Sequence, residues 1–319
     1  MKRTLFFCIT SALVVALFVA DICIGSVDIP LGRVIAALTG NGVDARTQTI
    51  VIDLRLVKAI TALLAGIALS ISGLQMQTMF RNPLAGPYVL GLSSGASLGV
   101  ALLLLCGAGS SMGIAAAAMA GAAAVMALLL LVNERVKNVM TLLILGILFS
   151  SAIGSVVQIL QFLSHEQALK SYVVWTMGSL SEVTAPQLAI LTGCVAVGLL
   201  LSVITAKPLN LLELGETFAR TMGVDLRRSR LAILASTTLL AGSVTAFCGP
   251  IGFIGMAMPH IARALTGESD NRFLLPASAL VGAAVLIACD IISRRFLIPI
   301  NAVTSLAGIP VVAYVVIKK

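Results

Sequence analysis

The sequence predicts an all-α, polytopic membrane protein of about ten transmembrane helices, folded as a single domain over residues 1–319. Its 319 residues are 59% hydrophobic and only 11% charged, whereas soluble domains carry about 25% charged residues. The mean hydropathy of +1.08 agrees with this class. The charged residues also gather between long apolar runs, and only lipid tolerates so much outward-facing hydrocarbon.

Charged residues mark the ends of the spans, because a crossing needs roughly 20 apolar residues and a charge at a helix centre costs about 2.5–3.5 kcal/mol. The first apolar run follows Lys2 and Arg3 as in a signal peptide, but no small-x-small cleavage site follows, so we expect an uncleaved helix. Two later runs are too long for one crossing, and turn-like residues predict breaks at Gly107–Gly113 and Cys248–Pro250. The uncharged runs are Leu5–Ala20, Ala59–Phe80, Asn82–Asn133, Asn138–Ser164, Val183–Ala206, Leu231–Pro259, Phe273–Cys289 and Phe296–Ile317.

The distribution of basic residues orients the chain. The net charge is +8, but Lys and Arg sit in short caps between apolar runs, which indicates loop charge rather than a nucleic-acid-binding stripe. If the N-terminus is cytoplasmic, most of the 21 basic residues fall on the cytoplasmic side, and the positive-inside rule then predicts that both termini are cytoplasmic. The residues counted there are Lys2, Arg3, Arg81, Arg135, Lys137, Lys207, Arg220, Arg227, Arg228, Arg230, Arg263, Arg272, Lys318 and Lys319.

Two segments rich in Gly and Pro interrupt the apolar pattern, Arg81–Ala96 and Cys248–Ala262. Lipid cannot satisfy the backbone groups that these residues free, so both segments should face protein or a water-filled cavity. Both carry a Gly-Pro pair followed by a further glycine, and each follows an apolar helix. This predicts an inverted repeat that relates helices 2–5 to helices 7–10, with a chance coincidence of two breaks as the alternative.

The long charged loop Lys207–Arg230 has apolar residues at helical spacing. They are Leu211, Leu212 and Leu214 before Gly215, and Phe218, Ala219 and Met222 after it. A hydrophobic face outside the membrane needs a partner. The residues alone leave two possibilities open: a helix lying on lipid headgroups, and a docking surface for a cytoplasmic protein.

Nothing in the sequence supplies energy for transport. It contains no GxxxxGK[ST] motif, so the chain should not hydrolyse ATP. The helix interiors offer no Asp, Glu or His for a coupling ion, apart from Asp290, which we expect to pair with Arg294 four residues on. The six dispersed cysteines, together with His165 and His260, lack metal-ligand spacing, so we expect no metal and no cofactor.

Three motifs, in order along the chain, carry a resemblance to a known family. They are SGLQMQTMFRNPLAGPYVLGLSSGA from Ser72, LNLLELGETFARTMGV from Leu209 and GPIGFIGMAMPHIAR from Gly249. The chain resembles the FecCD-type permeases of ABC importers for iron-siderophores, haem and vitamin B12, over essentially its whole length. The resemblance implies a single transmembrane permease domain in the bacterial inner (plasma) membrane, with 207–230 as a cytoplasmic coupling loop.

The resemblance further implies a homodimer that binds two copies of a cytoplasmic ATPase subunit and an extracytoplasmic substrate-binding protein. The chain would then be no enzyme, because the partner hydrolyses ATP. The coupling segment that matches the family contains Leu214, Gly215, Glu216, Ala219, Arg220 and Gly223.

The resemblance also assigns residues at both membrane faces. Arg55, Lys58 and Arg294 match basic positions that grip the binding protein; interfacial anchoring is the alternative, and Lys58 replaces the usual Arg and its bidentate fork. At the inner mouth the gate turn matches at Asn82, Pro83 and Leu84, with capping of the turn by Asn82 as the alternative.

Two segments depart from the family pattern. Val139 and Met140 stand where small polar residues would complete the gate, and Leu297–Asn301 replaces a common acidic motif. The favoured function is import of an iron-siderophore, with vitamin B12 or haem as alternatives of the same importer class. An ion-coupled secondary carrier and an uncoupled channel or scaffold are the other hypotheses.

Overall fold

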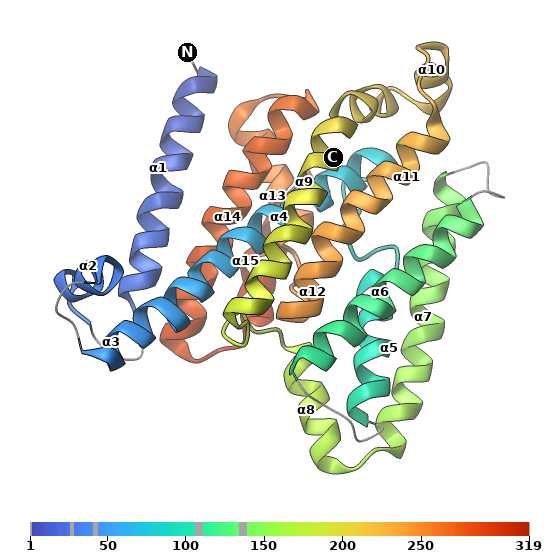
Figure 1. Ribbon diagram of the computed structural model, residues 1–319. Coiled ribbons are helices and arrows are strands. Elements are labelled where there is room, and N and C mark those ends of the chain that lie inside the picture. Colours follow the sequence, from blue (N-terminus) through green and yellow to red (C-terminus); the bar gives the residue numbers. More distant parts are fainter. Residues whose placement is uncertain (1, 26–28, 41–43, 106–110, 134–138, 319) are drawn as a thin grey trace.

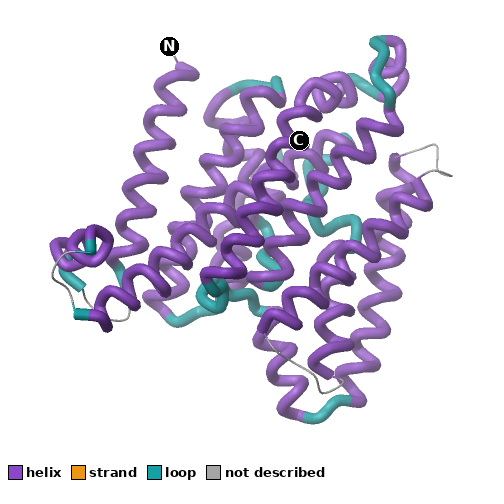
Figure 2. The backbone as a smooth tube through the Cα atoms, in the orientation of Figure 1, coloured by secondary structure: helices purple, strands orange, loops and turns teal. Residues whose placement is uncertain are grey.

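The computed structural model describes residues 2–25, 29–40, 44–105, 111–133 and 139–318. Within these ranges every regular element is helical (Figures 1 and 2). The prediction of an all-α fold is therefore confirmed. Seven candidate spans among the described residues are long and apolar enough to cross a membrane. They are α1 (Lys2–Cys23), α6 (Ser111–Asn133), α7 (Val139–Leu163), α9 (Ala185–Glu213), the continuous run α11 (Leu226–Thr237), η2 (Thr238–Gly242) and α12 (Ser243–Cys248), α14 (Asn271–Phe296) and α15 (Ile300–Ile317).

Helix α4 (Val57–Phe80) is the centre of the bundle, buried along most of its length against α9, α13 (Ile254–Thr266) and α14 (Figure 1). Glycine makes the close approach of these backbones possible. A Cβ on Gly73 would lie 1.7 Å from the carbonyl oxygen of Gly255, and one on Gly66 would lie 2.5 Å from that of Gly282. Small residues at such crossings let helix backbones touch, which is a common source of stability in membranes.

Replacing Gly73 with alanine should destabilise the protein by about 3 kcal/mol or more, because its methyl group meets a backbone carbonyl that cannot swing aside. Thermal unfolding in detergent measures the loss. Gly193→Ala on α9 is the matched control, since no atom lies within 4 Å of an added Cβ there. Equal melting temperatures for the two variants would show that α4 and α13 are not packed this closely.

A buried polar cluster also joins α4 to α9 and α11. The Gln75 side chain donates to the hydroxyl oxygens of Ser236 (3.1 Å) and Thr205 (3.4 Å), and its Oε1 accepts from Thr237 at 3.2 Å. Ser236 in turn donates to the carbonyl oxygen of Gly198 at 2.8 Å. Hydrogen bonds of this kind satisfy polar groups that lipid cannot.

Shorter helices complete the chain. Helices α2 (Leu31–Thr39) and α3 (Ala45–Thr49) and a π-helical turn, η1 (Ile50–Leu56), lie between α1 and α4. Helix α5 (Leu92–Leu105) precedes α6, and α8 (Glu166–Thr176) connects α7 to α9. Most were not predicted, because hydropathy over a spanning window does not detect short helices.

The predicted breaks can be compared with the helix ends. The break at Cys248–Pro250 is confirmed: α12 ends at Cys248, Gly249 has φ 71°, and α13 begins at Ile254. The break at Gly107–Gly113 falls largely outside the described residues, as do Arg135 and Lys137. Helix α9 continues through Pro208 to Glu213, so the expected loop is shorter than 207–230 at its start.

One end of the bundle gathers three distant parts of the chain. The N-terminus of α1 and α10 (Glu216–Thr221) lie at the same end in Figure 1. Arg3 forms an ion pair with Glu268 in the turn before α14. Val315, near the end of α15, lines a cavity together with Arg81 and Glu213. We call this the α10 end of the molecule.

Candidate functional site

The coupling segment is a compact knuckle at the α10 end. Leu214 terminates α9, and Gly215 then adopts φ 116° and ψ 151°, a backbone conformation that residues other than glycine rarely adopt. The carbonyl oxygen of Gly215 accepts from the Ala219 N–H at 2.9 Å and so starts α10. Gly223, with φ 82°, reverses the chain into α11. Two glycines therefore fix the angle at which α10 projects.

One face of α10 anchors it to the bundle. Ala219 is fully buried and packs in the same cluster as Leu209 and Leu212 of α9 and Ile233 of α11. Glu216 pairs with Arg230, whose side chain is 7% exposed. The anchoring contacts explain why α9 passes through Pro208: its last turn buries two leucines.

The other face of α10 is apolar and exposed. Leu214, Phe218 and Met222 are 64%, 43% and 59% exposed. Phe218 and Met222, four residues apart, lie on one side of α10, and Leu214 directly precedes Gly215 at its start. Arg220 is exposed beside them. We call Leu214, Phe218 and Met222 the apolar crest. Exposed apolar side chains on a short helix outside the spans are a surface suited to a protein partner.

The gate turn follows α4 directly. Arg81 ends the helix in a left-handed conformation, with φ 49° and ψ 36°. The Asn82 side chain accepts the backbone N–H of Leu84 at 3.0 Å, so Asn82 caps the turn. Leu84 is 41% exposed. The turn is thus ordered by its own side chain and leaves a leucine free to meet another surface.

Helix α13 holds the gate turn in place. His260 Nε2 lies 2.7 Å from the carbonyl oxygen of Pro83, which can only accept, so the ring nitrogen is the donor. Gln77 donates to the carbonyl oxygen of Met256 at 2.8 Å and accepts from Arg263 at 3.1 Å. His260 therefore forms a hydrogen bond within the bundle.

Arg81 lies between the knuckle and the gate turn. It lines a cavity of about 510 Å³ beneath α10, together with Gly215 and Phe218. It also lines a second cavity of about 380 Å³ with Asn82 and His260. Arg81, at the end of α4, therefore lies where a movement of α10 could reach the turn that follows α4.

The outer basic residues Arg55, Lys58 and Arg294 turn into the protein. Lys58 pairs with Asp290 at 3.0 Å, and Arg294 pairs with Asp290 at 2.9 Å and with Asp21 at 3.0 Å. The predicted pair of Asp290 and Arg294 is confirmed. Lys58 and Arg294 are each 13% exposed. We call Asp21, Lys58, Asp290 and Arg294 the charge cluster; it joins α1, α4 and α14.

Arg55 has a separate contact with α1. It is 5% exposed and donates to the carbonyl oxygens of Ile22 (3.0 Å) and Cys23 (2.9 Å). A Cβ on Gly25 would lie 2.4 Å from its guanidinium, so a larger residue there would displace the Arg55 side chain. Arg55, Lys58 and Arg294 nevertheless share the wall of an outer recess of about 370 Å³.

Asp21 is the member of the charge cluster that sequence reasoning missed. It is fully buried and lies two residues before the end of α1. The signal was present, because a lone carboxylate interrupting an apolar run marks a group that needs a partner inside the protein. Its partner, Arg294, lies at the other end of the chain, beyond the range of local pattern analysis.

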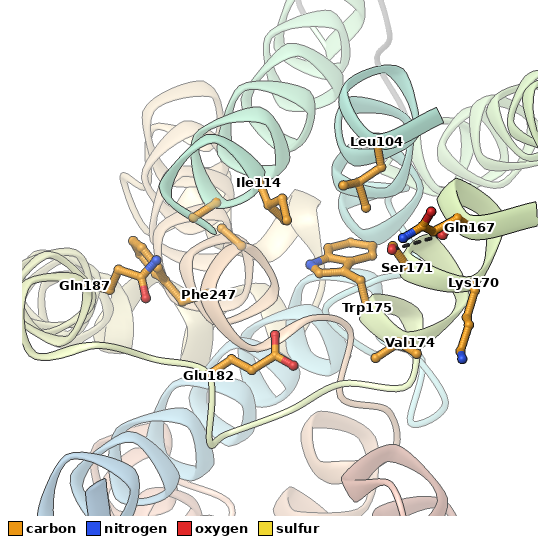
Figure 3. Close-up of a pocket in the computed structure, with 12 residues that line it drawn as sticks. Leu104, Ile114, Gln167, Lys170, Ser171, Val174, Trp175, Glu182, Gln187 and Phe247 are labelled. Carbon is orange, nitrogen blue, oxygen red and sulfur yellow. Dashed lines mark hydrogen bonds between the residues drawn. The ribbon is translucent and has the colours of Figure 1, made fainter. Parts of the chain in front are cut away.

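A larger recess of about 540 Å³ lies away from the α10 end, where α8 meets α5, α6, α9 and α12. Figure 3 shows Trp175 in its wall, with Leu104, Ile114 and Phe247 nearby. Lys170, Glu182 and two glutamines supply polar groups around these side chains (Figure 3). Such a wall can contact apolar and polar parts of one ligand.

Among the described residues no group of three or more His, Cys, Asp or Glu could hold a metal ion. His165 directly precedes α8, and His260 lies in α13. The five cysteines that the structure describes are free thiols.

Comparison with known proteins decides the family. The model of the FecCD transport family matches residues 13–318. The chain belongs to the FecCD transport family. A relative of this FecCD chain, the hemin transport system permease protein HmuU of Yersinia pestis, is 33% identical over 84% of this chain and 83% of its own. The vitamin B12 import system permease protein BtuC of Klebsiella pneumoniae is 34% identical over 99% of this chain and 94% of the BtuC chain.

A solved structure shares the FecCD fold found here. It is described as a metal-chelate type ABC transporter in an inward-facing conformation, and it matches with a TM-score of 0.87 and 29% identity over 99% of both chains. This FecCD protein is thus the membrane-spanning permease of an ABC importer, as its sequence motifs predicted.

Proposed function

We propose that this FecCD permease works as a homodimer in the bacterial inner membrane, with two cytoplasmic ATPase subunits and an extracytoplasmic binding protein, and that it imports an iron chelate. The observation that carries the proposal is the apolar crest, held by Gly215 and Gly223 at a fixed angle on the end of the bundle. A coupling helix needs this combination of a rigid base and an exposed apolar face. ATP hydrolysis then belongs to the partner.

Reconstitution tests this function. The chain, coexpressed with its ATPase, should copurify with it and should take up ferric siderophore into vesicles only when ATP and the binding protein are present. Uptake driven by an ion gradient without the ATPase would contradict the proposal and favour a secondary carrier. The charge cluster favours the importer, because Asp290 is paired with Lys58 and Arg294, and Asp21 with Arg294.

Ten spans result when α4, α5 and α13 are added to the seven candidates. Two sets of four then follow one another, α4 to α7 and α11 to α15, with the α11, η2 and α12 run counted once. This order supports the inverted repeat of helices 2–5 and 7–10. With the α10 end in the cytoplasm, both termini are cytoplasmic, because Arg3 and Val315 lie at that end.

We assign the gate to Asn82, Pro83 and Leu84, with Arg81 as the neighbour that senses α10. Val139 and Met140 begin α7, and Met140 is 45% exposed, so an apolar contact would replace the small polar one typical of the family. The outer recess bearing Arg55, Lys58 and Arg294 is the proposed docking site for acidic side chains of the binding protein. The exposed Leu297, at 88%, borders this face.

Replacing His260 with alanine should loosen the gate turn, because the Pro83 carbonyl oxygen loses its donor. The cost of leaving such a group unpaired is about 1–3 kcal/mol, so amide hydrogen exchange over residues 82–91 should accelerate by about tenfold. His260→Gln, which retains an N–H donor, should recover part of the protection. His165→Ala should leave this segment unchanged, and unaltered exchange in His260→Ala would show that α13 does not hold the turn.

The substrate is proposed from relatives of differing specificity. The two relatives are named for hemin and vitamin B12, and the solved structure for metal chelates. All three ligands are bulky metal-containing molecules, which supports that class for this chain. Uptake assays with labelled ferric siderophore, haem and cobalamin, offered separately to a deletion strain, distinguish them.

A further inference from the structure

A groove on the side of the bundle lies outside every site described above. It is formed by α4, α9 and α14 and encloses about 640 Å³. Its wall is mostly hydrocarbon, with Ile67 and Ile71 from α4, Leu199 and Val203 from α9, and Leu275 from α14. All three of these helices belong to the membrane-embedded bundle, so we expect hydrocarbon to occupy the groove.

The rim of the groove on α9 is exposed in a way that indicates lipid contact. Leu200, Val203 and Ile204 are 65%, 70% and 69% exposed within one candidate span. Lipid tolerates such side chains, whereas water does not. The groove is therefore reached from the bilayer.

Two cations close the groove at the α10 end. Lys207 follows directly after Ala206 on α9, and Arg272 is the second residue of α14; both line the groove and both side chains are exposed. Over the described part of the chain, neither the Lys207 ammonium nor the Arg272 guanidinium has an ion pair or a side-chain hydrogen bond. A groove with an apolar wall and two cations at one end is complementary to a lipid whose acyl chain is attached to an anionic headgroup.

One carboxylate near this mouth offsets part of the charge. Asp270 accepts from the backbone N–H of Arg272 at 2.9 Å and from the Asn210 side chain at 2.6 Å. These two hydrogen bonds hold the pKa of Asp270 below its ordinary value. Asp270 is therefore ionised at neutral pH, and both hydrogen bonds engage its Oδ1. Lys207 and Arg272 carry two positive charges against this single negative charge, so the three side chains have a net positive charge.

We infer that this groove binds an anionic phospholipid of the inner leaflet, with an acyl chain along α4, α9 and α14 and the phosphate between Lys207 and Arg272. The choice of leaflet rests on the proposed function, in which the α10 end is cytoplasmic. Zwitterionic lipids share the acyl chains but lack the net negative charge. Each basic residue near an anionic headgroup is worth about a fivefold gain in binding, so two predict about 30-fold.

Native mass spectrometry of the purified full-length chain tests this. Dioleoyl phosphatidylglycerol and dioleoyl phosphatidylcholine, added separately at equal concentrations, should differ in retention by about tenfold or more, within the gain expected from two cations. The double variant K207Q/R272Q should lose this preference. Val203→Trp, which fills the groove without changing charge, should lower the retention of both lipids.

The double variant R220Q/R228Q is the matched control, because it removes two exposed cations from the same end but away from the groove. It should keep the preference. Equal retention of the two lipids by the unaltered chain, a preference that survives K207Q/R272Q, or a second copy of the chain that excludes both lipids would each overturn the inference. No ATPase, binding protein or substrate is present, so failure here leaves the import function untouched.

Discussion

Replacing Leu214 and Phe218 with aspartate should abolish copurification of the ATPase while the permease remains folded. Both side chains belong to the apolar crest and contribute little to the core, being 64% and 43% exposed. Buried apolar anchors at protein interfaces each account for about 2 kcal/mol or more, which is about 30-fold in affinity for each residue. ATP-dependent uptake should fall with the affinity. Affinity purification measures the binding of the ATPase, and vesicle uptake on the same preparation measures ATP-dependent transport.

Leu297→Asp is the matched control for this experiment. Leu297 is 88% exposed and follows the end of α14, at the opposite end of that helix from the α10 side. It undergoes the same chemical change without touching the crest, so ATPase binding should be unaltered. If L214D/F218D still bound the ATPase with normal affinity, α10 would not be the coupling helix, and the alternative of a helix lying on lipid headgroups would regain support.

Removing the Arg294 side chain should destabilise the permease by about 3–5 kcal/mol, the usual cost of leaving a buried carboxylate, here that of Asp21, without its cation. Arg294 contacts both Asp21 and Asp290, and these carboxylates are 0% and 1% exposed. Arg294→Ala should therefore lower the melting temperature strongly, even in the absence of a binding protein. Thermal unfolding in detergent is the measurement.

The neighbouring Arg295 offers the matched control, since it is exposed at the same helix end. The Arg295→Ala variant should have the same melting temperature as the unaltered protein. A double-mutant cycle with Asp290→Ala measures how much of the effect belongs to the pair. If Arg294→Ala weakened only the affinity for the binding protein and left stability unchanged, docking would be the main role of Arg294 and the charge cluster would contribute little.

The parts of the fold that could be predicted were those that leave a local pattern. The break at Cys248–Pro250 follows from Gly and Pro, which cannot continue a helix without consequence, and α12 ends there. Apolar residues on both sides of Gly215 were expected to form a face outside the membrane, and Leu214, Phe218 and Met222 are exposed, whereas Leu212 and Ala219 are buried. Gly215 was likewise recognised from the sequence as the point that separates the two apolar segments of the loop.

Other parts depended on contacts between distant segments. Arg55, Lys58 and Arg294 appeared as outward-facing charges because their partners, including Asp21 and the carbonyl oxygens at the end of α1, come from another part of the chain. Packing of its last turn likewise extended α9 past Pro208, against the local preference of proline. Tertiary contact outweighed local pattern in both cases.

The glycine contacts of α4 have a consequence for how the permease moves. At Gly73 and Gly66 the backbone of α4 lies close against Gly255 of α13 and Gly282 of α14, so we expect the three helices to move together rather than slide past one another. His260 fastens the turn that follows α4 to the same α13. In the proposed import cycle a tilt of α4 would therefore carry α13 and the turn after α4 with it as one rigid unit, and we expect the passage to widen by a rocking of whole helices rather than by bending of the turn.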